Sequence, residues 1–140
     1  MQTKANFIVM TEFDRRRLEA LLELLRARSS VDASQLTELE NELERAHVVE
    51  PQQIPGDVVT MNSEVLVLDL ESGERKSIKL VFPGSSAVDE GRISVLAPVG
   101  LALLGCREAD EVSLPAPGRT RRVRIERVVY QPEAAGNFAL

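Results

Sequence analysis

The chain has no tryptophan, and its aromatic residues are one tyrosine and four phenylalanines. Proteins that bind single-stranded nucleic acid usually stack the bases on aromatic side chains, so this scarcity argues against such a surface. Positive charge is also in deficit, because the formal net charge is −5. General binding to a phosphate backbone depends on lysine and arginine. We therefore expect no direct, sequence-specific binding to nucleic acid, and any connection with nucleic acid should pass through a protein partner.

Cysteine and histidine are represented by a single residue each. Cys106 cannot form an internal disulfide, which agrees with a reducing compartment. His47 stands far from it in the sequence, so the pattern supports neither a cysteine–histidine nucleophile nor a zinc site. We interpret Cys106 as a small, partly buried side chain, and His47 as a partner for carbonyl groups at the end of a helix. We expect no metal and no other cofactor.

Long apolar runs are missing as well. No stretch is long enough to span a membrane, and the opening MQTKANFIVM has too short an apolar run for a signal peptide. These features predict a cytoplasmic protein. The 140 residues suffice for one domain, or for one small core with an appendage. We expect the chain to act as a monomer.

Leucines with helical spacing dominate the first third of the chain. Thr11, followed three residues later by Asp14, has the pattern of a helix N-cap with an acid in the first turn. The apolar residues then recur at i, i+3, i+4 and i+7, as on one face of an amphipathic helix. The two sets are Leu18, Leu21, Leu22 and Leu25, and then Leu36, Leu39, Leu43 and Ala46. With a short connector between them, two helices of about 20 Å each should pair as an antiparallel hairpin.

The charges of the two helices are of opposite sign. Residues 14–28 hold five arginines and three acids, whereas residues 31–50 hold six acids and one arginine. Exposed ion pairs contribute only about 0–1 kcal/mol each, so this attraction supports the pairing less than the leucine seam does.

The pattern changes from helical to β after the second helix. Residues 48–57 contain two prolines and a glycine and are typical of a linker, which divides the chain into 1–50 and 51–140. Two strand-like runs then flank Ser72 and Gly73, a hairpin turn signal. A later pair of runs forms the last predicted hairpin, and in its second run Val123 and Ile125 alternate with polar residues.

One short helix is expected inside this β region. PVGLALLG opens with Pro98 and closes with Gly105, the usual positions of these residues at helix ends. In the last strand the alternation slips at residues 127–128, which indicates a bulge. The sequence thus predicts an α+β fold, in which a short coiled-coil hairpin precedes a small antiparallel sheet with one short helix.

Three stretches resemble known bacterial families. ISVLAPVGLALLGCREADEVSLPAPG, residues 93–118, resembles the C-terminal domain of the Gre transcript-cleavage factors, with Ala109 as a minor departure. PGDVVTMNSEV (residues 55–65) and VVYQPEAAGNFAL (residues 128–140), together with the short hairpin, resemble the regulators of nucleoside diphosphate kinase, the Rnk family. The resemblance covers essentially the whole chain, and the arm is its least specific part.

This resemblance implies an FKBP-like C-terminal domain, a coiled-coil arm and binding to RNA polymerase at its secondary channel, in competition with other channel-binding factors. In Gre factors the segment before the short helix contacts the polymerase near the channel rim. Carried over to this chain, that segment is Leu96, Ala97, Pro98 and Val99. A loop that proline makes rigid suits a small interface anchor, although Leu96 and Val99 could equally close the core.

The connector RARSSVDASQ, residues 26–35, would form the tip of the arm. Transcript cleavage in Gre-type factors resembles two-metal hydrolysis, in which tip acids help to hold a catalytic magnesium ion. Those factors carry two neighbouring acids on a long arm, whereas this tip has Asp32 alone on a short arm. Asp32 could instead cap the second helix, unless Ser34 takes that role, and Arg28 could be solvated or touch a partner. We therefore expect a binding module without cleavage activity.

The alternatives are an active Gre-type cleavage factor and, on the FKBP-like fold alone, a prolyl isomerase. Isomerase pockets are usually rich in aromatic residues, which this chain lacks, and a fold alone does not carry a function. The last strand also carries a basic stripe, interpreted as a solvated or edge-protecting face or as a surface for an acidic partner. Its members are Arg119, Arg121, Arg122, Arg124 and Arg127.

Overall fold

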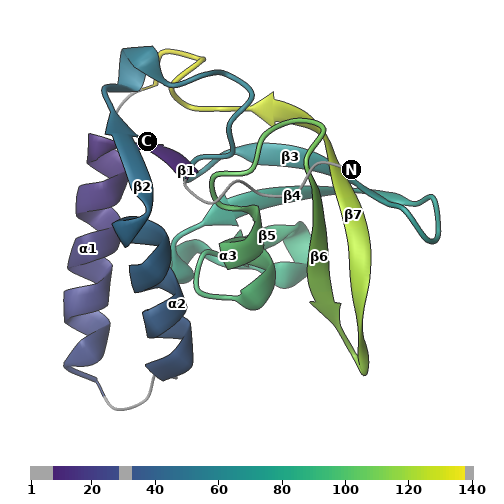
Figure 1. Cartoon of the computed structure of the whole chain (residues 1–140), viewed down its shortest axis with the longest axis horizontal. Coiled ribbons are helices and arrows are strands. Elements are labelled where there is room, and N and C mark those ends of the chain that lie inside the picture. The colour runs from purple at the N-terminus through teal and green to yellow at the C-terminus, as the bar shows by residue number, and fades with distance from the viewer. Residues whose placement is uncertain (1–7, 29–32, 138–140) are drawn as a thin grey trace.

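The computed structural model of the chain describes residues 8–28 and 33–137. A two-helix arm stands beside a curled five-stranded sheet, and a short helix lies between the arm and the last hairpin of the sheet (Figure 1). Within the described ranges, no helix has the length and apolar character needed to cross a membrane. The arrangement confirms the predicted α+β class.

The arm comprises β1 (Ile8–Thr11), α1 (Glu12–Arg26), α2 (Ala33–Glu44) and β2 (Ala46–Val49). As predicted, Thr11 caps α1, because its side-chain oxygen accepts a hydrogen bond from the backbone N–H of Asp14 at 3.1 Å. The predicted leucine seam is also present, with three buried leucines from each helix. These are Leu18, Leu22, Leu25, Leu36, Leu39 and Leu43. Burial of each such side chain contributes about 1.5–3 kcal/mol, so the seam holds the two helices together.

A small parallel sheet forms the base of the arm, and the sequence analysis does not predict it. β1 pairs with β2, and Ile8 stands opposite Ala46. The prediction that Ala46 extends the second helix is wrong, since α2 ends at Glu44 and the chain continues as a strand. Pro51–Gln53 then forms a 3₁₀ turn. The irregular segment therefore begins later than the predicted linker and extends to residue 63, directly before Glu64.

The sheet comprises β3 (Glu64–Asp69), β4 (Arg75–Val81), β5 (Arg92–Ser94), β6 (Glu111–Ala116) and β7 (Arg119–Tyr130). Its order is β5-β4-β3-β7-β6. The sheet is mostly antiparallel, and β5 alone runs parallel to its neighbour, β4. The predicted β3–β4 hairpin turns at Gly73, whose φ of +77° is available to glycine at little cost. Val123 and Ile125 are buried, as their alternation predicts.

Two register shifts interrupt the pairing of β3 with β7. One lies between Glu64 and Val65, and the other between Leu66 and Val67. On β7 they stand on either side of the slip predicted at residues 127–128. The irregularity is therefore real but occurs twice, which increases the local twist of the sheet.

α3 (Pro98–Leu103) lies between Pro98 and Gly105, as predicted. Gly105 has a φ of +79°, the left-handed conformation that commonly follows a helix. A Cβ added there would lie 2.4 Å from the Cβ of Ile8. The first strand of the arm therefore packs directly on the end of α3, which fixes the arm beside this helix.

Gly100 lets the first turn of α3 approach the end of β5. A Cβ added to Gly100 would lie 2.1 Å from the carbonyl oxygen of Ser94, which cannot move aside without shifting β5. We expect Gly100→Ala to lower the free energy of unfolding by about 1–3 kcal/mol, the usual cost of extra atoms in a packed core. Urea unfolding measures this loss. Gly84→Ala is the matched control, because no atom of the residues that the structure describes lies within 4 Å of a Cβ there. Equal losses in the two variants would contradict this packing.

Candidate functional site

Residues 96–99 connect β5 to α3 and include the first two residues of α3. Leu96 is buried, and Val99 packs partly buried against the core, so the core interpretation holds for these two. The backbone N–H of Leu96 donates to the Ser94 side-chain oxygen at 3.0 Å, which restrains the loop. Ala97 is half-buried and Pro98 is exposed. The surface that this segment offers to a partner is therefore Ala97 and Pro98, and their binding role stays a prediction.

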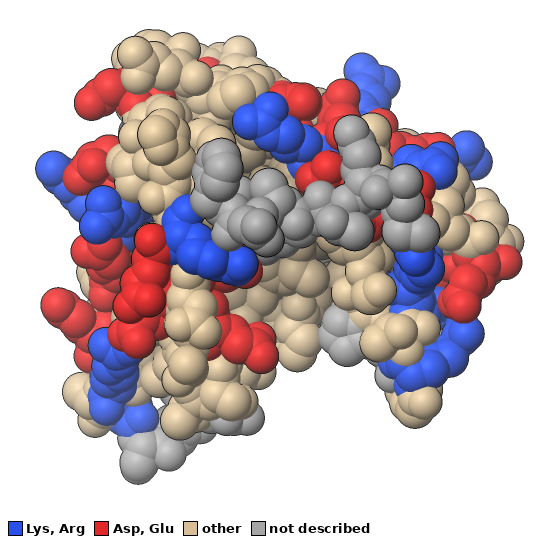
Figure 2. Space-filling view, in the orientation of Figure 1, with Lys and Arg blue, Asp and Glu red and all other residues tan. Residues whose placement is uncertain are grey.

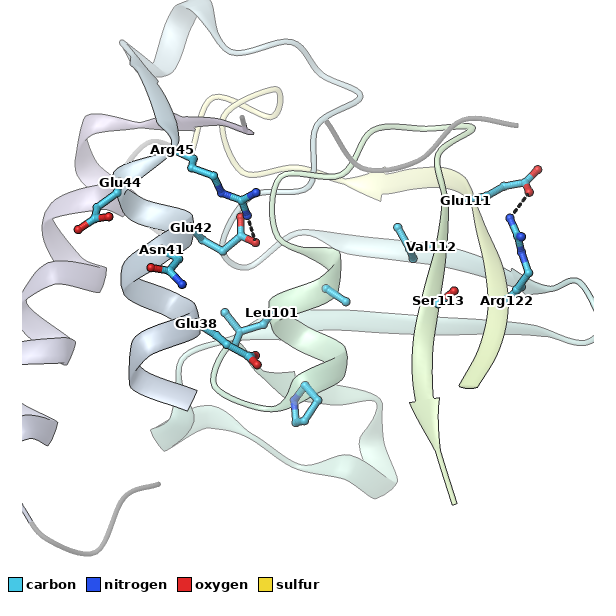
Figure 3. A pocket seen from close by; sticks show the side chains of 12 residues that line it. Glu38, Asn41, Glu42, Glu44, Arg45, Leu101, Glu111, Val112, Ser113 and Arg122 are labelled. Atoms are coloured by element: carbon cyan, nitrogen blue, oxygen red, sulfur yellow. Dashed lines mark hydrogen bonds and ion pairs between the residues drawn. The ribbon is translucent and has the colours of Figure 1, made fainter. Parts of the chain in front are cut away.

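A groove of about 820 Å³ separates α2 from α3 and the β6–β7 hairpin. Figure 2 shows the molecule hollowed between the arm and this hairpin. Pro98, Leu101 and Ala102 of α3 supply an apolar side, and α2 faces them with charged and polar side chains (Figure 3). The exposed Pro98 thus lines a groove that α2 of the arm also lines. No pattern in the sequence predicts this groove.

Some charges that line the groove are paired within the protein. Arg45 donates to Glu42 at 2.6 Å on α2. On the sheet side, Arg122 and Arg124 donate to Glu111 at 3.2 and 3.1 Å. These two arginines, and above all the hydrogen bond from Arg124, lower the pKa of Glu111. On the sheet side, the two charged residues that line the groove, Glu111 and Arg122, therefore offset each other.

Glu38 and Glu44 on α2 differ from these paired groups. Both are exposed, both line the groove, and the side chain of neither makes a hydrogen bond or ion pair with another residue in the ranges 8–28 and 33–137. Figure 3 shows Glu38 beside Leu101 of α3. The arm side of the groove is therefore an acidic wall above an apolar floor.

Asp14 links the arm to the sheet domain. Its carboxylate is 1% exposed and accepts a hydrogen bond from the Met61 backbone N–H at 3.1 Å and one from Arg17 at 2.5 Å. The Arg17 guanidinium lies over the rings of Phe13 and Phe82, at 4.1 and 4.7 Å from their centres. Cation–π contacts of this kind contribute about 0.5–1 kcal/mol or more when partly desolvated. The orientation of the arm is therefore set by a network that joins α1 to the sheet domain.

Burial raises the pKa of Asp14 from 3.8 to about 6. The negative charge of Glu133 also raises it, whereas Arg17 and the Met61 N–H lower it, and the value of about 6 is the net of these effects. From the sequence, Asp14 is predicted only as an acid in the first turn of α1. Its position four residues before Leu18, on the face of the leucine seam, was the signal that it points inward.

The Asp14 carboxyl should make the stability of the protein depend on pH. The pKa of Asp14 is higher in the folded state than in the unfolded state. Its contribution to the free energy of unfolding is therefore fully present below pH 3.8 and is lost as pH rises through about 6. The loss amounts to about 3 kcal/mol. Asp14→Asn keeps the shape and removes the titration, so wild type should lose about this much relative to the variant between pH 4 and 7.5. Urea unfolding across that range measures it.

The control for this pH series is Asp89→Asn, which alters an exposed carboxyl outside the elements of the arm. It should follow wild type at every pH. A constant difference between wild type and Asp14→Asn across the range would contradict the raised pKa.

The tip of the arm is described only in part. Arg28 is exposed, as predicted, and its backbone N–H donates to the Leu25 carbonyl at 3.0 Å. Asp32 lies outside the described residues, so its role as cap or contact stays a prediction. Ser34 lies within α2, so it does not cap that helix. Arg26 of α1 pairs with Glu40 of α2, a salt bridge between the helices near the tip.

The basic stripe of β7 is largely neutralised by neighbouring acids. Arg119 pairs with Glu71 at 3.2 Å and Arg121 with Asp69 at 2.5 Å, in addition to the pairs with Glu111. Edge protection is the wrong explanation for the stripe, because β7 lies inside the sheet between β3 and β6. Arg127 is exposed.

The single cysteine is buried, whereas the single histidine is exposed. Cys106 is completely buried and donates to the Ala102 carbonyl oxygen at 3.1 Å, so the prediction of a structural side chain is confirmed. His47 lies on β2, three residues after the end of α2, and the interpretation that it meets helix carbonyls stays a prediction. In the described part of the chain, no three or more His, Cys, Asp and Glu residues are grouped so as to hold a metal ion.

The two halves of the chain match different family models. Residues 54–130 match the model for the C-terminal domain of transcription elongation factors GreA and GreB. Residues 7–49 match the model for the Rnk N-terminus. The groove therefore lies between elements that belong to the two matched regions.

Individual relatives agree with these matches. The chain is 37% identical over 134 residues to the regulator of nucleoside diphosphate kinase of Escherichia coli (strain K12), which covers 95% of the chain and 96% of that relative. It is 32% identical over 106 residues to the transcription elongation factor GreA of Thermodesulfovibrio yellowstonii, covering 76% of the chain and 67% of that factor.

A solved structure agrees as well. The transcription elongation factor GreA/GreB from Nitrosomonas europaea is 44% identical and superimposes with a TM-score of 0.76, covering 88% of this chain and 99% of that one. Sequence and fold give the same assignment along nearly the whole chain. The chain belongs to the Rnk family of regulators of nucleoside diphosphate kinase, and its C-terminal half to the GreA/GreB C-terminal domain family.

Proposed function

We propose that this chain is a transcription regulator that binds RNA polymerase at its secondary channel and competes there with Gre-type factors. The observation that carries the proposal is the match of residues 54–130 to the GreA/GreB C-terminal domain, with Pro98 exposed where that family is expected to contact the polymerase. The C-terminal domain supplies the docking surface, and the arm reaches the mouth of the channel. Such a protein acts in the cytoplasm.

We further propose that the chain does not stimulate transcript cleavage. α1 has 15 residues and α2 has 12, so at 1.5 Å per residue the arm is only about 20 Å long. A catalytic magnesium ion is usually held by one or two carboxylates together with the substrate. The tip sequence supplies Asp32 alone where cleavage factors carry two acids.

Backtracked elongation complexes test the absence of cleavage. A GreA factor added to such complexes releases a short 3′ RNA fragment, and this chain at saturating concentration is expected to release none above the polymerase alone. Binding is established in the same samples by co-elution with core polymerase, so that inactivity is not confused with failure to bind. Fragment release would show an active cleavage factor and overturn this part of the proposal.

We propose that any effect on nucleoside diphosphate kinase is on its expression. The relative from Escherichia coli carries that enzyme in its name. A regulator that acts through polymerase would change the amount of the enzyme without touching it. Purified kinase should therefore not co-elute with this chain under conditions in which core polymerase does, and a stable complex with the kinase would contradict the proposal.

A further inference from the structure

The acidic wall and the apolar floor of the groove come from different parts of the chain. Glu38 and Glu44 project from α2 of the arm, whereas Pro98 and Leu101 belong to α3. Packing of Ile8 on Gly105 and the Asp14–Met61 hydrogen bond hold these parts together, so the groove is formed before any partner binds. Preorganised surfaces of this kind lose less entropy on binding.

The charge of the groove selects among possible occupants. The carboxylates of Glu38 and Glu44 repel phosphate groups, which excludes a nucleic acid backbone. A second copy of this chain is also a poor match, because most arginines of its β7 stripe are already paired with Asp69, Glu71 and Glu111. A protein segment with unpaired lysine or arginine residues complements the wall, and an aliphatic side chain beside them fits the floor.

We propose that this groove is the docking site for a basic segment of RNA polymerase, whose lysine or arginine side chains meet Glu38 and Glu44 while an aliphatic neighbour packs against Pro98 and Leu101. This inference rests on the proposed function and deepens it, because it adds the acidic face of the arm to the predicted loop contact. The arm then contributes to docking along its side, in addition to any contact at its tip.

Charge reversal on α2 tests the proposal. Glu38→Arg should weaken binding to core polymerase about tenfold at 50 mM salt and less at 300 mM salt, because exposed charges are screened within about 10 Å at 0.1 M ionic strength. Glutamate and arginine both have high helix propensity, so the arm should stay folded, and circular dichroism verifies this. The matched control is Glu74→Arg, an equal charge change in the exposed β3–β4 turn, which should alter the affinity less than twofold.

The outcomes separate this inference from the proposed function. If wild type fails to bind core polymerase, the proposed function itself is wrong. If wild type binds and Glu38→Arg binds equally well, only the groove inference is overturned.

A photo-crosslinking amino acid at Asn41, which is exposed and lines the groove, gives an independent test. In the complex with core polymerase, the crosslinked peptide should come from a polymerase subunit and contain lysine or arginine residues. A crosslink to a second copy of this chain, or to an acidic polymerase peptide, would overturn the inference.

Discussion

Pro98→Arg is expected to weaken binding to core polymerase by about 30-fold, the effect of losing a contact worth about 2 kcal/mol at the centre of an interface. Pro98 is exposed at the first position of α3, so the substitution removes no buried contact. The long cation would be brought against a surface expected to be apolar and basic, where it would be desolvated without a partner. If it instead turned toward Glu38, it would neutralise the acidic wall. Both outcomes reduce affinity.

Pro83→Arg is the matched control for this substitution. Pro83 also occupies the start of a short helical turn, at Pro83–Ser85, and lies outside the groove. It should change the polymerase affinity less than twofold in the same titration. Equal losses for the two variants would show that Pro98 has no special place in docking, and unchanged affinity for Pro98→Arg would remove the loop from the interface.

Leu39→Ala is expected to lower the free energy of unfolding by about 2–5 kcal/mol, the range measured for leucine truncations in packed cores. Leu39 is 0% exposed at the centre of the seam between α1 and α2, and the short arm has few other contacts to absorb the loss. A small domain has a total stability of about 5–15 kcal/mol, so the change is a large fraction of it. Urea unfolding followed by circular dichroism measures the effect.

Leu24→Ala is the control for the arm. Leu24 lies on α1 but is 53% exposed, so its truncation should cost less than about 0.5 kcal/mol. A similar cost for the two leucines would mean that the seam does not hold the arm together. Because Leu39 faces α1 and not the groove, any loss of polymerase binding in Leu39→Ala should follow the loss of helical signal.

The elements that the sequence predicts are those encoded by local patterns. The leucine spacing identifies both helices of the arm, and the turn at Gly73 identifies the β3–β4 hairpin. Pro98 and Gly105 mark the ends of α3 because each has a conformational preference of its own at a helix terminus. None of these predictions needs knowledge of a distant partner.

The features that the sequence analysis misses depend on distant contacts. β1 and β2 are four residues each. In the sequence one precedes the helical hairpin and the other follows it, and their pairing joins these two segments. Their short runs of β-branched residues, IVMT and AHVV, were the available signal, but the second run precedes prolines and is typical of a linker. The groove likewise exists only because α2 packs beside α3, a placement that neither helix encodes alone.

Within the predicted contact segment, residues 96–99, the side chains differ in exposure. Pro98 was expected at the surface and is exposed there, whereas Leu96 from the same segment belongs to the core. An isolated loop sequence does not say which of its apolar side chains turns inward. Asp14 is the opposite case: a polar residue that is typical of a helix start is buried, and its carboxylate accepts a hydrogen bond from the Met61 backbone N–H.

Competition for core polymerase tests the central claim most directly. A labelled GreA factor bound to core polymerase is titrated with this chain, with wild type and Asp32→Ala in parallel. The account predicts that wild type displaces the factor completely at saturation, and that Asp32→Ala displaces it with nearly the same affinity, since docking lies in the C-terminal domain and along the side of the arm. Failure of wild type to displace the factor, while both remain bound to the polymerase, would contradict it.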